Sequence, residues 1–86
     1  SLIASSCAVG KDSQIISSSI NSGCRIGKRV VIDHSVLWSG VEVGDDVKIV
    51  GCVVGNLCRI GKDAILSGTI LGDDSRISDY SRLEIS

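Results

Sequence analysis

The sequence predicts an all-β fold, a parallel β-helix of about five triangular coils that are each 17 residues long. Three observations predict it. Large aliphatic residues recur every 17 positions, they do so in three separate sets, and small residues follow them at fixed distances without any insertion. The repeat occupies the whole chain, so we expect residues 1–86 to form one domain of this β-helix.

The three aliphatic sets, here called the core positions, predict three short strands in each coil. They are spaced six, six and five residues apart, which does not follow the 3.6-residue period of an α-helix. Side chains alternate along a strand, so we expect the core positions to face inward and their neighbours to face outward. The sets are Ile3, Ile20, Leu37, Val54 and Leu71; Val9, Ile26, Val43, Ile60 and Ile77; and Ile15, Ile32, Ile49, Leu66 and Leu83.

Small or β-branched residues mark the predicted corners between strands. Polar, turn-forming pairs such as Lys11–Asp12 and Asp45–Asp46 precede some of them. We expect small side chains here because a tight corner leaves no room for bulk. The corner residues are Cys7, Cys24, Val41, Cys58 and Ser75; Ser13, Val30, Val47, Ala64 and Ser81; and Ser18, Ser35, Cys52 and Thr69.

Composition argues against several classes of function. The net charge is −1 with no basic run, which argues against a nucleic-acid partner, and no apolar run is long enough to span a membrane. The chain has four cysteines, none of them in a C-x-x-C pair, and only one histidine. We therefore expect reduced cysteines that pack as small apolar residues in a cytoplasmic protein, and neither a metal nor a cofactor. Oxidation of Cys7 with Cys24 on the next coil stays open.

No catalytic residue is expected. The segment from Gly55 to Lys62 fails as a phosphate-binding loop because five residues separate its glycines and Asp63 replaces the required hydroxyl. His34 lies between Asp33 and Ser35, but adjacent residues in a tight turn should not point at one another as a catalytic triad requires. Acidic pairs would need a cleft for acid–base catalysis, and uninterrupted coils should offer none.

The outward positions predict three different faces. The first face is apolar along its length and carries the only tryptophan, so we expect it to bind another protein. We expect Trp38 to be its anchor, with room for the indole left by Gly55. The predicted interface residues are Leu2, Val36, Trp38, Val53 and Ile70. The second face, with Arg25, Glu42, Arg59, Arg76 and several glycines, should be solvated, and the third face is mixed.

The two ends of the solenoid should expose unpaired strand edges. No capping helix or proline-rich stop is present in the sequence. We therefore expect that further coils or another domain precede Ser1 in a larger parent protein, or that ends stack between molecules.

The repeat resembles the hexapeptide repeat of left-handed parallel β-helices, over essentially the whole chain. Each unit is an aliphatic residue, a glycine or small residue, two variable residues and a small one. Left-handedness is what the resemblance implies, since crossovers are otherwise right-handed. Hexapeptide acyltransferases share this fold and use a histidine near an acyl-CoA groove between subunits. That alternative is disfavoured because no loop leaves the predicted coils and no recognisable motif surrounds His34.

Residues 24–64, with the Ser-Val-Leu-Trp step at 35–38, resemble the C-terminal β-helices of nucleotidyltransferase-like proteins. These include the gamma and epsilon subunits of eukaryotic translation initiation factor 2B, a guanine-nucleotide exchange factor, and GDP-mannose pyrophosphorylase. Closure of the helix soon after residues 71–77 favours gamma. The resemblance implies a non-catalytic assembly domain that contacts other subunits, an upstream nucleotidyltransferase-like domain or a second copy. A regulatory β-helix of a sugar-1-phosphate nucleotidyltransferase is the alternative.

Overall fold

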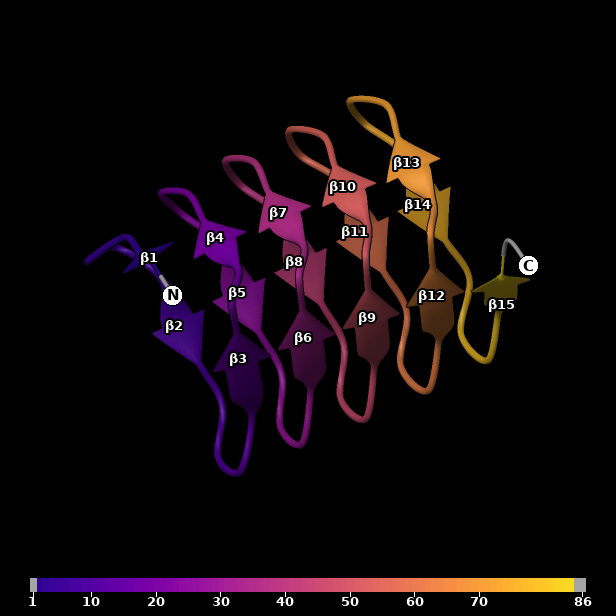
Figure 1. Ribbon diagram of the computed structural model, residues 1–86, viewed down its shortest axis with the longest axis horizontal. Helices are drawn as coiled ribbons and strands as arrows, with labels where there is room; N and C mark the ends of the chain where they lie inside the picture. Colours follow the sequence, from indigo (N-terminus) through magenta and orange to yellow (C-terminus); the bar gives the residue numbers. More distant parts are fainter. Residues whose placement is uncertain (1, 85–86) are drawn as a thin grey trace.

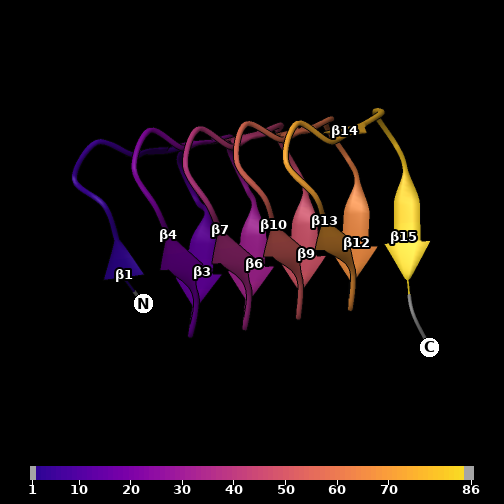
Figure 2. The same cartoon turned by 90° about the horizontal axis from the view of Figure 1, so that it is seen from above.

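The protein is a solenoid of five stacked coils, which a computed structural model describes for residues 2–84 (Figure 1). Each coil contains three strands of two or three residues, and the coils follow one another along the longest axis, whose extent is 32 Å. Seen from above, equivalent strands lie side by side from one coil to the next (Figure 2). The predicted β-helix and its 17-residue coils are confirmed.

Three parallel five-stranded sheets form the sides of the prism. The first sheet contains β1 (Leu2–Ile3), β4 (Ser19–Ile20), β7 (Val36–Leu37), β10 (Val53–Val54) and β13 (Ile70–Leu71). The second contains β2 (Ala8–Val9), β5 (Arg25–Ile26), β8 (Glu42–Val43), β11 (Arg59–Ile60) and β14 (Arg76–Ile77). The third contains β3 (Gln14–Ile16), β6 (Val31–Asp33), β9 (Lys48–Val50), β12 (Ile65–Ser67) and β15 (Arg82–Glu84).

The register between coils is a shift of one 17-residue period. Leu37 of β7 pairs with Ile20 of β4 on one side and with Val54 of β10 on the other. Backbone hydrogen bonds join each coil to the next, as where Trp38 N donates to Val54 O at 2.9 Å. Residues 17 apart therefore stand in columns along the solenoid axis, and the chemistry of each column is visible in the sequence.

The core is the stack of inward-facing aliphatic residues and the small residues at the corners. The core positions of the three central coils are almost completely shielded from solvent, as predicted. They are Ile20, Ile26, Ile32, Leu37, Val43, Ile49, Val54, Ile60 and Leu66. Corner residues including Cys24, Val30, Val41 and Ala64 are fully buried beside them. The prediction that corners need small residues is consistent with this packing.

A left-handed backbone residue stands immediately before the small residue in thirteen corners of the described chain. Its φ lies between 47° and 73° in every case. Glycine occupies four of these positions, but His34, Leu57 and Tyr80 occupy others, although side chains are disfavoured there. The sequence predicts turns at these places but does not mark the column of left-handed residues.

Several glycines allow the close approach of successive coils. A Cβ added to Gly55 would lie 2.7 Å from the backbone nitrogen of Asp73 in the fifth coil. Its nearest neighbours belong to Asp73 and Gly72 and not to Trp38. Glycine is therefore required at position 55 by the turn of the following coil, and the expectation that it also makes room for the indole stays a prediction. Gly10, Gly27, Gly44 and Gly61 are enclosed in the same manner.

Candidate functional site

The first face, the outer side of the first sheet, brings together the residues that the sequence predicted as an interface. Leu2, Val36, Val53 and Ile70 stand in one column of this sheet, which only Ser19 interrupts. Ile70 is 79% exposed, whereas Val36 is partly shielded. Trp38 follows β7 and is 47% exposed. A row of exposed apolar side chains on a rigid sheet is typical of a surface that contacts another protein.

The backbone at Trp38 is held from two neighbouring coils. Its amide donates to Val54 O at 2.9 Å, and its carbonyl accepts a hydrogen bond from Cys24 Sγ at 2.9 Å. A large side chain on a fixed backbone loses little conformational entropy on binding. Trp38 therefore has the geometry of an interface anchor.

Leu57 extends the apolar surface around the corner that follows β10. It is 61% exposed and has a φ of 58°, and its Cδ2 lies 2.6 Å from where a Cβ on Gly40 would stand. The sequence analysis did not single it out. A signal was present, because the equivalent residues in other coils are Ser6, Gly23, Gly40 and Asp74. A large apolar residue that replaces glycine at a left-handed position costs stability and points to a contact elsewhere.

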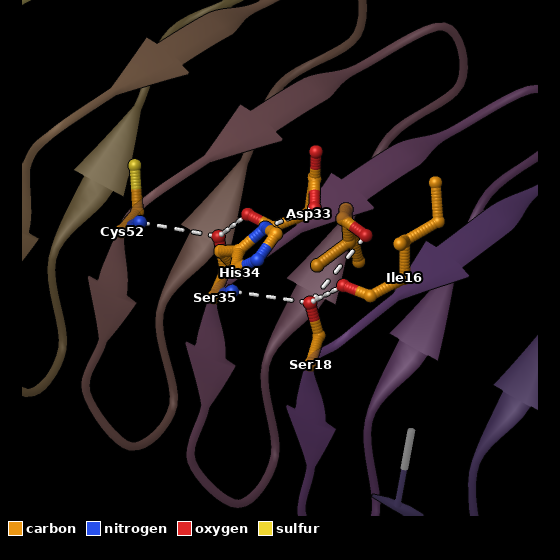
Figure 3. A network of polar contacts seen from close by, with 7 residues as sticks. Ile16, Ser18, Asp33, His34, Ser35 and Cys52 are labelled. Carbon is orange, nitrogen blue, oxygen red and sulfur yellow. Dashed lines mark hydrogen bonds and ion pairs between the residues drawn. The ribbon is translucent and has the colours of Figure 1, made fainter.

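His34 meets Asp33 but does not form a catalytic triad (Figure 3). Its Nδ1 lies 2.5 Å from Asp33 Oδ1, so the prediction that neighbouring side chains in this turn would not point at one another is wrong. The left-handed backbone at His34 explains the difference. Ser35 is buried, and its hydroxyl donates to the main-chain oxygen of Asp33 at 2.8 Å. Because that hydroxyl points into the corner, His34 has no nucleophile to activate.

The corner of Ser35 belongs to a ladder of polar contacts between coils (Figure 3). Ser35 N donates to Ser18 Oγ at 3.1 Å, and Cys52 N donates to Ser35 Oγ at 3.1 Å. Each hydroxyl thus satisfies an amide of the next coil that the strand pairing leaves free. These serines have a structural role that their small size alone did not predict.

All four cysteines are free thiols. Cys24, Cys52 and Cys58 are buried, as the prediction of small packing residues required, and each thiol donates to a main-chain oxygen. Burial raises the pKa of the Cys24 thiol, which keeps it protonated and unreactive at neutral pH. Among residues 2–84, no group of three His, Cys, Asp or Glu side chains is arranged to hold a metal.

The second face, the outer side of the second sheet, is not featureless. An open groove of about 570 Å³ lies over it, lined by Arg25, Glu42, Arg59, Arg76 and the residues between them. Among the described residues that line this groove, Glu42 is the one carboxylate, so the groove does not supply the paired acids that acid–base catalysis needs.

Within residues 2–84 the structure contains no helix that is long and apolar enough to cross a membrane.

The fold has a counterpart among solved structures. The acetyltransferase domain of PglB from Neisseria gonorrhoeae FA1090 superposes with a TM-score of 0.54 at 16% sequence identity. The match covers 99% of this chain and 47% of that one, so the present chain spans about half the length of the solved structure. At this identity the likeness concerns the fold alone. No curated protein sequence matches the chain.

A family model matches residues 1–83, which is nearly the whole chain, and it describes the EIF2B subunit epsilon LbH domain. The match agrees with the parallel sheets, the 17-residue coils and the helix-free solenoid described above. It also confirms the left-handed β-helix, for which the abbreviation LbH stands. This chain belongs to the family of EIF2B subunit epsilon left-handed β-helix domains.

Proposed function

We propose that this chain is a non-catalytic assembly domain of the guanine-nucleotide exchange complex that acts in translation initiation. The observation that carries the proposal is the exposed apolar first face with Trp38 on a fixed backbone. The matched family supports the placement in this complex, and its description favours the epsilon over the gamma subunit. The proposal places the chain in the cytoplasm, and the free thiols are consistent with that compartment.

The partner of the first face, in this proposal, is another subunit of the complex or a nucleotidyltransferase-like domain of the same protein. Ile70 and Trp38 offer the centre of the contact because they combine large area with exposure. Neither carries a charge, so the contact does not require that a buried ion be desolvated.

Reconstitution of the complex with variants of the first face tests this proposal. Trp38→Ala and Ile70→Ser should each weaken association with the other subunits by about 2 kcal/mol or more, which is roughly thirtyfold. The matched control is Ile16→Ser, which changes an isoleucine that is also exposed but lies on the third face. Association by analytical ultracentrifugation and unfolding by circular dichroism should be measured together. Unchanged association of both first-face variants would contradict the proposal.

An acetyl-CoA titration separates this proposal from an acyltransferase. The one histidine is engaged by Asp33, and Ser35 faces the corner, so we expect no specific acetyl-CoA site in residues 2–84. Calorimetry with acetyl-CoA should therefore record no saturable heat. Saturable binding that Trp38→Ala leaves unchanged would instead favour an acyl-transfer function.

A further inference from the structure

The second face is built as a step, with a row of long charged side chains beside a row of bare positions. The residue before each core position forms the tall row, and the residue after it forms the bare row. The tall row is Ala8, Arg25, Glu42, Arg59 and Arg76. The bare row is Gly10, Gly27, Gly44, Gly61 and Ser78. The glycines are there because a Cβ would collide with the next coil.

The step forms a continuous hollow from the second coil to the fifth. The groove of about 570 Å³ is floored by Val43, Ile60 and Ile77, with the arginine side chains as one wall. A smaller hollow of about 300 Å³ adjoins it, shares Glu42, Arg59 and Arg76, and reaches Leu57 and Asp74 at the corner. The surface can therefore receive an extended chain alongside the arginines, because the groove is open to solvent.

The charge in this groove is unbalanced. Three arginines face one carboxylate of the tall row, although the whole chain has a net charge of −1. Arg59 Nε lies 3.6 Å from Glu42 Oε2, whereas Arg25 and Arg76 form no ion pair within residues 2–84. Arg59 and Arg76 are direct neighbours in the register of β11 and β14. Like charges at such positions repel each other, and an anionic group between them would relieve the repulsion.

We propose that the second face binds an acidic peptide segment. The carboxylates of this segment accept hydrogen bonds from Arg25, Arg59 and Arg76, which line the groove. These arginines span three coil steps, which is about 14 Å and corresponds to about four or five residues of an extended peptide. A polypeptide fits better than a single-stranded nucleic acid because none of the described residues that line the groove is aromatic, so bases would find no side chain to stack on.

The probe for the test is a fluorescein-labelled decaglutamate peptide, titrated with the chain while fluorescence anisotropy is recorded. We expect saturable binding that weakens as salt rises, since it depends on opposite charges. The double variant Arg59→Gln, Arg76→Gln should weaken binding at least tenfold. The matched control is Arg82→Gln, which removes an equally exposed arginine from the third face and should leave binding unchanged.

Charge reversal keeps the result interpretable if binding is weak. Arg59→Glu with Arg76→Glu should abolish decaglutamate binding and create binding of a labelled decalysine. Trp38→Ala should leave decaglutamate binding unchanged, which separates this surface from the first face. The proposal is overturned if both arginine variants bind decaglutamate like the original chain, if no binding is detected at low salt, or if an oligouridylate of equal charge binds more tightly.

Discussion

The central coils and the outer coils have the same repeat but different surroundings. Leu66 in the fourth coil and Leu83 in the fifth are register partners in the third sheet, with the same side chain at the same core position. Leu66 is fully buried, whereas Leu83 is 39% exposed. Ile3 and Val9 in the first coil are likewise exposed, although their equivalents Ile20 and Ile26 are buried. The repeat determines which residues face inward, but burial requires a coil on both sides.

The outer coils are therefore where the apolar interior of the solenoid reaches the surface. Repeat proteins usually cap such ends, because the ends expose unpaired strand edges and half-covered aliphatic residues. This comparison predicts that equal substitutions should cost much in the centre and little at the ends.

Leu66→Ala should lower the free energy of unfolding by about 2–5 kcal/mol because it leaves a cavity among fully packed neighbours. Leu83→Ala, at the same core position one coil later, should cost roughly 1 kcal/mol, since much of the side chain is already in water. Urea denaturation followed by circular dichroism measures both. Equal costs for the two variants would mean that the fifth coil is as well packed as the fourth.

Gly55→Ala should lower the free energy of unfolding by about 1–3 kcal/mol because the new Cβ would press on the backbone of Asp73. Gly72 occupies the same column in the fifth coil, and a Cβ there would meet nothing within 4 Å. Gly72→Ala should therefore be neutral, or stabilise by about 0.5 kcal/mol through the loss of freedom in the unfolded chain. Thermal unfolding of the pair checks this, and a large cost at position 72 would break the comparison.

Ser35→Ala should cost about 1–3 kcal/mol because it leaves the buried amide of Cys52 without its acceptor. Ser13 makes the corresponding contact from the first coil, where Val30 N donates to its Oγ at 3.1 Å. Ser13→Ala should cost less than the change at Ser35, since Ser13 is only partly buried and water can replace its hydroxyl. Hydrogen exchange of the Cys52 and Val30 amides would show which coil contact opens.

Arg29→Ala should have the smallest effect because its ion pair with Asp46 joins two central coils entirely at the surface. Two hydrogen bonds from Arg29, at 2.7 and 2.9 Å, lower the pKa of Asp46 below its ordinary value. The pair therefore stabilises the fold above that ordinary pKa, and the contribution is lost as pH falls through the lowered one. NMR titration should find the pKa of Asp46 raised in the variant. A large loss of unfolding free energy at pH 7 would contradict the idea that burial, and not surface ion pairing, makes the central coils more stable than the outer ones.

The periodic part of the structure was predictable because one residue type at one spacing decides each column. Leu37, Val43 and Ile49 lie inside, and Trp38, Val53 and Ile70 lie on one face, as their spacing indicated. The contact between His34 and Asp33 was not predictable, because it depends on a left-handed residue that composition does not mark. The open groove of the second face was also missed, since it forms only where side chains of successive coils stand beside one another.

The sequence by itself determined the number of coils, the inward residues and the residue types on each face. The reason is that strands which repeat strictly every 17 residues can pair in parallel in only one register. The tertiary structure decided how much of each residue is covered, where an extra Cβ would collide and which side chains meet across a corner. Those properties depend on the coil above and the coil below, which lie 17 residues away along the chain but in direct contact in space.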